Sequence, residues 1–423
     1  MSISTSSPIK PPAASAGLFS LPVIVAALGY FVDIYDLLLF GIVRVPSLKD
    51  LGLSAGQISI VGANILNWQM GGLLLGGILW GVLGDKRGRL SVLFGSIITY
   101  SIANVACGFV ADVTFMDPTT YYAGMRFIAG IGLAGELGAG ITLVSESLPT
   151  NKRAIGTSLV AGVGLFGAVM AYFTVQLFDW QTAFFIGGGL GFGLLLLRVG
   201  VVESGMFTNV TKQEGVSRGD FLSFFTNRDR FIRYIKCIGI GLPTWFVIGI
   251  LATFSNEFGK AFGIAEEIQP GLAIMWCYVG LAVGDLASGF ISQAMESRKK
   301  GVALLMAIAL VGTLVYLYAG ISSPTAVYGL CLLMGFGIGY WAMFVTIGAE
   351  QFGTNLRATA ATTIPNMVRG TVILMTSLYG YLKPGLDVIN AGAVVGLICF
   401  VLGFYSILTV PETHGKDLNY LEE

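Results

Sequence analysis

The sequence has one histidine, His414, and five cysteines in its 423 residues. The histidine lies near the end of the chain, and the cysteines fall in apolar runs without the spacing of a metal site or a disulfide framework. A membrane-embedded enzyme would need a metal cluster or a nucleophile with its base, and the apolar runs hold no histidine for either. We therefore expect no metal site, no cofactor, no disulfides and no enzymatic activity.

Charge is also scarce, because charged residues make up only 11% of the chain and hydrophobic residues make up 55%. A soluble domain of this length does not have such a composition, so we expect a polytopic protein embedded in a lipid bilayer. The formal net charge is zero, which gives no sign of a nucleic-acid partner. We expect the protein to act as a monomer.

Twelve apolar segments are long enough, at about 20 residues each, to cross the hydrocarbon core. They start near Leu18, Ile58, Leu90, Thr119, Ala154, Gln181, Ile232, Gln269, Gly301, Thr325, Ala358 and Leu386. With both termini cytoplasmic, the inner loops and tails hold eighteen of the 24 Lys and Arg residues. The outer loops hold four of the others, which are Arg44, Lys49, Lys260 and Lys383. The remaining two, Arg126 and Arg369, lie within spans. Short loops and tails indicate a bacterial inner membrane.

The chain divides into two halves that repeat each other. We expect a disordered cytoplasmic tail (1–16), a six-helix bundle (17–201), a cytoplasmic segment with a short amphipathic helix (202–231), a second six-helix bundle (232–410) and a cytoplasmic tail (411–423). Gly72 and Gly76 of span two recur 208 residues later as Gly280 and Gly284 of span eight. A charged pair, Glu146 with Arg153, recurs 204 residues later as Glu350 with Arg357. The fold is therefore predicted to be all-α, with two pseudo-symmetric bundles.

A charged loop between spans two and three is predicted to act as a cytoplasmic gate. Its glycines allow close packing and a tight turn, and its carboxylate accepts hydrogen bonds from a helix N-terminus or from nearby cations. Such contacts hold the inner ends of the halves together in one state only; the alternative is that the cations merely orient the protein. The predicted gate residues are Gly81, Asp85, Arg87, Gly88, Arg89, Glu146, Arg153, Glu350 and Arg357.

This loop resembles the signature of the major facilitator superfamily, and the resemblance extends over the whole chain. The segments 126–132 and 411–416, together with Glu146 and Arg153, are similar to the sugar-porter-related branch, which includes metabolite:proton and phosphate:proton symporters. The resemblance implies a transporter that works by alternating access. The second half departs from the pattern, because Gln293 replaces the loop aspartate.

Carboxylates within the spans are the candidates for proton coupling, since no histidine is available there. Asp33 and Asp36 share a helical face with Tyr30 in span one, and Arg126 of span four lies at a similar depth. We expect Asp36 and Arg126 to pair, either as a switch or as a static ion pair between helices. By the resemblance, Asp36 matches an essential carboxylate of these symporters, and Glu136 is the second candidate for the proton carrier.

A lone cation near the middle of span eleven is the candidate for substrate binding. Arg369 has no acid in its own span, which favours an anionic ligand over the alternative partner, Asp285 of span eight. Polar and aromatic residues expected around the ligand are Tyr30, Asn67, Gln69, Trp245, Tyr340 and Trp341.

Together these features favour a proton-coupled symporter of a small organic anion, a mono- or dicarboxylate. Phosphate is the second candidate for the substrate, and a sugar or polyol is the third. A channel would show a pore-lining ring or a filter loop, and the sequence has neither.

Overall fold

The computed structural model describes residues 20–87, 89–136, 150–203, 221–353, 356–414 and 422, and every regular element in these ranges is helical. Within these ranges the first half contains six long helices. These are α1 (Leu21–Asp50), α2 (Ala55–Arg87), α3 (Arg89–Gly108), α4 (Pro118–Leu133), α6 (Thr150–Leu177) and α7 (Trp180–Glu203), with the short η1 (Val110–Asp112) after α3.

In the second half, three stretches are interrupted helices. One consists of α9 (Arg228–Phe246), the π-helical η2 (Val247–Ala252) and α10 (Ser255–Ala261). The others are α13 (Pro324–Gly337) with α14 (Trp341–Glu350), and α15 (Arg357–Gly370) with α16 (Val372–Thr409). The remaining helices are α8 (Ser223–Thr226), α11 (Pro270–Ala294) and α12 (Arg298–Tyr318).

These helices give the twelve predicted crossings. Nine helical stretches of the described ranges are long and apolar enough to span a membrane. The last of them, which includes α16, reverses direction at Asp387, where φ is 69°, and therefore crosses twice. The shorter helices α3 and α4 complete the set, so the prediction of an all-α, twelve-helix membrane fold is confirmed.

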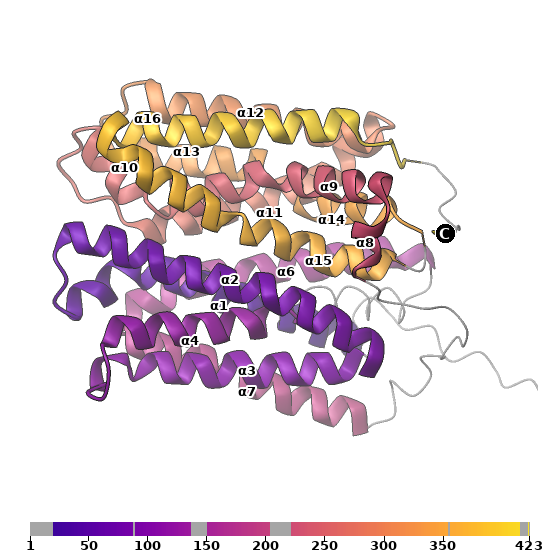
Figure 1. Ribbon diagram of the computed structural model, residues 1–423, viewed down its shortest axis with the longest axis horizontal. Coiled ribbons are helices and arrows are strands. Elements are labelled where there is room, and N and C mark those ends of the chain that lie inside the picture. The colour runs from indigo at the N-terminus through magenta and orange to yellow at the C-terminus, as the bar shows by residue number, and fades with distance from the viewer. Residues whose placement is uncertain are drawn as a thin grey trace, which may run out of the picture.

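The two halves lie side by side with their helices running roughly along the same axis (Figure 1). They contact each other mainly through α2 against α15 and through α6 against α11. The turn between α1 and α2 lies at one end of the bundle, and α8 lies at the other end, close to the C-terminus (Figure 1).

Glycines of the sequence repeat make the same helix crossing in each half. A methyl group placed on Gly72 of α2 would lie 2.1 Å from the carbonyl oxygen of Phe127 in α4, and one placed on Gly280 of α11 would lie 2.1 Å from that of Leu332 in α13. Without side chains, these positions let the two backbones approach closely, and such close packing favours helix association in lipid. The repeat therefore encodes the pseudo-symmetry of the packing.

Three details differ from the sequence prediction. Arg44 and Arg198 do not lie in loops but inside α1 and α7, where both are buried because each finds partners within the bundle. The seventh crossing begins at Arg228, four residues before the predicted Ile232. The expected surface helix at 221–230 is only the four-residue α8, whose Phe224 is buried and stacked on Tyr234.

Replacing Gly280 by Ala should destabilise the protein, because the new methyl group meets the backbone of α13. Such overpacking costs about 1–3 kcal/mol. Gly329→Ala is the matched control, since Gly329 of α13 is exposed and a methyl group added to it would meet no other atom. Because Ala has a higher helix propensity than Gly, this substitution should leave the stability unchanged or raise it slightly. Thermal unfolding of the purified proteins in detergent measures both, and equal shifts in the two variants would contradict the packing argument.

Candidate functional site

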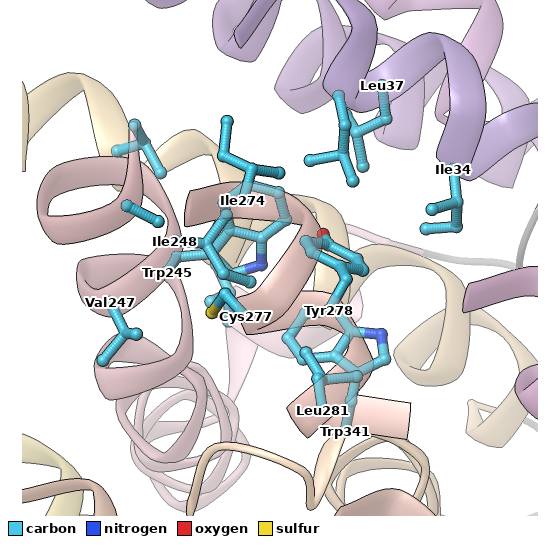
Figure 2. Packing of buried hydrophobic residues seen from close by; sticks show 14 of the residues in the cluster. Ile34, Leu37, Trp245, Val247, Ile248, Ile274, Cys277, Tyr278, Leu281 and Trp341 are labelled. Carbon is cyan, nitrogen blue, oxygen red and sulfur yellow. The ribbon is translucent and has the colours of Figure 1, made fainter. Parts of the chain in front are cut away.

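A small cavity lies between the two halves. Its volume is about 10 Å³, which is about the space that one water molecule needs. Side chains from α1 and α6 of the first half and from α9, η2, α11, α14 and α15 of the second half line it. Figure 2 labels several of them within the cluster of buried hydrophobic residues. The lining residues are Tyr30, Ile34, Leu165, Thr244, Trp245, Ile248, Tyr278, Leu281, Trp341 and Arg369.

Arg369 supplies the only formal charge among these lining residues. Its side chain is 1% exposed, and its one hydrogen bond to another described side chain is donated by Nη1 to Oδ1 of Asn366, at 3.3 Å. The guanidinium carbon lies 5.8 Å from the ring centroids of both Trp245 and Trp341, within cation–π range. In the described part of the chain Arg369 forms no ion pair and its Nε has no acceptor, so it is a buried cation without a carboxylate bound to it.

Asp285, the alternative partner for Arg369, is bound elsewhere. Its Oδ1 accepts a hydrogen bond from the backbone N–H of Ala342, at 2.9 Å. The alternative to a ligand, an ion pair between Asp285 and Arg369, is therefore not formed in this conformation.

Three of the six residues expected around the ligand line the cavity, namely Tyr30, Trp245 and Trp341. The other three point to partners outside it, because a polar group in a membrane must find a hydrogen bond within the protein. Tyr340 donates to the carbonyl of Ile240 at 3.1 Å, Gln69 donates to that of Leu37 at 2.8 Å, and Asn67 accepts from Thr376 at 2.5 Å.

Arg126 binds the backbone carbonyl of Asp36 and not its carboxylate, so the expected side-chain pair is not formed in this conformation. Arg126 donates from Nη2 to the carbonyl oxygen of Asp36 at 2.9 Å, from Nη1 to Asn104 at 2.7 Å and from Nε to Gln69 at 3.2 Å. The Asp36 carboxylate is fully buried and has no hydrogen-bond partner among the described residues. A methyl group on Gly187 of α7 would come within 2.3 Å of its Oδ1, so the carboxylate faces the interior of the first half.

Asp33 lies between this carboxylate and the cavity. At about 100° per residue, Asp33 falls between Tyr30, which lines the cavity, and Asp36, which faces α7. Both of its oxygens are buried without a partner in the described chain.

Glu136 forms a buried ion pair with Arg198 of α7, a partner that the sequence reading missed. The guanidinium holds both carboxylate oxygens, with one contact of 3.1 Å from Nη1 to Oε2 and a second from Nη2 to Oε1. The exposed fractions of Glu136 and Arg198 are 1% and 5%, and Gly29 of α1 leaves room for the pair. The signal available in the sequence was the apolar run around Arg198, which continues to Val202.

At the end opposite the C-terminus, polar contacts join the two halves. Arg44 of α1 donates to the carbonyl of Thr253 at 2.8 Å and to Asn256 at 3.1 Å. Lys383 of α16 pairs with Glu257 at 2.8 Å and also donates to Ser59 of α2 at 2.9 Å. The sequence reading counted Arg44 and Lys383 only as loop cations.

The predicted cytoplasmic gate is described in part. Glu350 pairs with Arg298 of α12 at 2.5 Å, and Arg357 donates to the carbonyl of Phe352 at 3.4 Å, so both have contacts within the second half. Gly81 lies close to Thr363 of α15, in ordinary contact. Gly88 and Glu146 lie outside the described residues, as do the side chains of Asp85, Arg87, Arg89 and Arg153.

Sequence comparison finds transporters. The chain is 27% identical over 411 residues to a putative metabolite transport protein of Haemophilus influenzae, covering 93% of this chain and 96% of that one. It is 26% identical to a niacin transporter of Acinetobacter baylyi (80% and 81% covered) and 25% identical to a gentisate transporter of Corynebacterium glutamicum (78% and 73% covered).

Structural comparison agrees on the fold. The inward-open xylose transporter of E. coli superposes with a TM-score of 0.68 at 16% identity, covering 95% of this chain and 98% of that one. A proton:xylose symporter bound to a bromo-deoxyglucose gives a TM-score of 0.71 at 17% identity, with 95% and 97% covered. The model of the Major Facilitator Superfamily matches residues 26–376. The chain therefore belongs to the Major Facilitator Superfamily and is a multi-pass membrane transporter.

Proposed function

We propose that the protein carries a small organic carboxylate together with protons across the bacterial inner membrane, as a monomer with both termini in the cytoplasm. The observation that carries this proposal is Arg369, a buried cation without a carboxylate partner in the described chain, facing a cavity between the halves. A charge in such a place is expensive unless a partner neutralises it, and residues that keep one mark substrate pathways. An anionic substrate supplies the missing partner.

The walls of the cavity favour a flat carboxylate. The rings of Trp245, Tyr278 and Trp341 line it together with Tyr30, and aromatic rings pack well against another ring. The donors left without an acceptor, Nε of Arg369 and Nε1 of Trp245, suit the two oxygens of a carboxylate. The names of the relatives, transporters of niacin and gentisate, also support an aromatic carboxylate.

Phosphate and sugars fit the cavity less well. A sugar leaves the Arg369 charge without a counter-ion, and phosphate meets mostly apolar and aromatic walls in place of the several donors it usually binds. Phosphate remains the second candidate and a neutral sugar or polyol the third.

The cavity is too small for any of these substrates. A volume of about 10 Å³ must grow before a ring enters, so the halves must move apart on one side at a time. The contacts that join them at the end opposite the C-terminus, Arg44 with Thr253 and Lys383 with Ser59, must then break on opening there.

Asp36 is the proposed proton carrier. Its carboxylate is buried without a partner in the described chain, and binding a proton removes the cost of that charge. Approach of the Arg126 guanidinium from the backbone to the carboxylate would favour release of the proton. Glu136 is less suited, since Arg198 already neutralises it.

Arg369→Gln should remove most of the affinity for carboxylates. Losing a charge-assisted contact costs about 1.5–3 kcal/mol, or roughly a tenfold to hundredfold weaker binding, and Arg369→Lys should recover only part of it because the forked donor is lost. A thermal-shift panel of nicotinate, benzoate, phosphate and xylose on purified protein measures this. Arg228→Gln, at an exposed cation, is the matched control. Stabilisation by xylose alone, unchanged in Arg369→Gln, would refute the anion proposal.

Asp36→Asn should abolish accumulation driven by a pH gradient and spare exchange of labelled for unlabelled substrate, because exchange needs no net proton movement. Proteoliposomes loaded with nicotinate or benzoate allow both measurements on one preparation. If gradient-driven accumulation survives in Asp36→Asn, Asp36 is not the proton carrier.

The Glu136–Arg198 pair allows a separate test. Removing one partner of a buried ion pair leaves an unpaired charge, at a cost of about 3–5 kcal/mol, whereas removing both is often neutral. We therefore expect Glu136→Leu and Arg198→Leu each to lower the melting temperature strongly, and the double variant to recover much of the loss and to keep gradient-driven uptake. Loss of uptake in a stable double variant would make Glu136 a carrier.

A further inference from the structure

Asn366 of α15 binds Arg369 and also reaches into the first half of the chain. It precedes Arg369 by three residues, so the two side chains lie on the same face of the helix. Its side chain is 2% exposed. Gly77 of α2 makes room for it, because a methyl group placed on Gly77 would lie 2.8 Å from Cβ of Asn366. The Asn366 side chain therefore packs directly against the backbone of the first half.

Three hydrogen bonds fix the amide group of Asn366. Its Nδ2 donates to the carbonyl oxygen of Thr362 within α15 and to that of Ala134, just after the end of α4, both at 3.0 Å. Its Oδ1 accepts from Nη1 of Arg369 at 3.3 Å. Because the nitrogen of an amide only donates and its oxygen only accepts, the two carbonyl groups determine that the oxygen faces Arg369.

The bond to Ala134 makes the hold on Arg369 depend on contact between the halves, since Ala134 belongs to the first half and Arg369 to the second. The helix α15 begins at the end of the bundle where the C-terminus lies (Figure 1), so Asn366 lies on that side of Arg369. When the halves separate on this side, Nδ2 loses the Ala134 carbonyl and keeps the Thr362 carbonyl, which lies in its own helix. The amide is then held less firmly.

An amide suits this position because it orients the guanidinium without neutralising it. A carboxylate in its place would pair with Arg369 and compete with an anionic substrate. An apolar side chain would leave Nη1 without this acceptor. With Nη1 bound to Asn366, Nε of Arg369 has no acceptor in the described chain and is available to a substrate carboxylate.

We propose that Asn366 is a positioning residue that links anion binding at Arg369 to the contact between α4 and α15, an inference that rests on the proposed function. While α4 and α15 are in contact, Asn366 holds the guanidinium in place for the substrate carboxylate. When they separate, this hold weakens and the anion leaves more readily on the side of the C-terminus. By linkage, a bound anion strengthens the contact between the halves by the same factor.

The test is a double-mutant cycle on the affinity for nicotinate and benzoate, measured by calorimetry on the full-length protein in nanodiscs. Asn366→Ala removes the acceptor of Arg369, and Gly77→Ala displaces the Asn366 side chain from the other half. Each should weaken binding about two- to tenfold, as for the loss of one hydrogen bond. The double variant should bind about as well as Asn366→Ala alone, because both changes act through one residue.

Gly71→Ala is the matched control for Gly77→Ala. It lies on the same helix, and its methyl group would come no closer than 3.8 Å to a side chain of another helix, so the affinity should not change. Melting temperatures establish that each variant is folded.

Asn366→Asp tests the charge argument, since it keeps the shape of the side chain and places a carboxylate beside Arg369. It should weaken binding of both anions at least about tenfold further than Asn366→Ala, because a contact between charged groups is stronger than a neutral one. Asn390→Asp adds the same charge at an exposed position and should leave binding unchanged. A merely structural role would not separate Asp from Ala in anion affinity.

The other outcomes separate the inference from the proposed function. Additive losses in the double variant would overturn the link between the halves, and so would wild-type affinity in Asn366→Ala. Equal affinities of Asn366→Asp and Asn366→Ala would overturn the positioning role. If neither anion binds the wild type, the proposed function itself fails.

Discussion

A bilayer offers no water to a buried charge, so a charge without a partner inside the protein is costly. Four arginines are buried inside the described helices, and three of them have such partners. Arg198 has Glu136, while Arg44 and Arg126 bind carbonyl and amide oxygens of neighbouring helices. Arg369 alone of the four faces the cavity between the halves, with one side-chain hydrogen bond, to Asn366. The site is organised around that incompletely satisfied cation.

The two halves have similar helix packing but carry different charged groups. Matched glycine crossings, at Gly72 in one half and Gly280 in the other, build similar bundles. The first half holds Asp33, Asp36 and the neutralised Glu136, and the second half supplies the cation and most of the aromatic wall. The proposed substrate and proton sites therefore lie in different halves, and motion between the halves would change both environments at once.

The fold could be predicted from the sequence because crossing a membrane depends on length and hydrophobicity, which are local properties. The position of Arg369 was readable for the same reason, since a lone cation in an apolar run is visible without tertiary contacts. The hydrogen-bond and ion-pair partners of the polar side chains could not be predicted from the sequence. Arg198 looked like a loop residue, and Asn67 and Gln69 looked like lining residues, because the helices that contact them lie far away in sequence. The break before Trp341 and its cap, Asp285, likewise depend on packing between distant helices.

The most direct test of the account is a structure of the protein with an iodinated benzoate, located by the anomalous scattering of its iodine. The account predicts both carboxylate oxygens within hydrogen-bond distance of Arg369 and the ring against Trp245 and Trp341. A ligand bound instead at Arg44 or Arg126, with Arg369 still held only by Asn366, would contradict it.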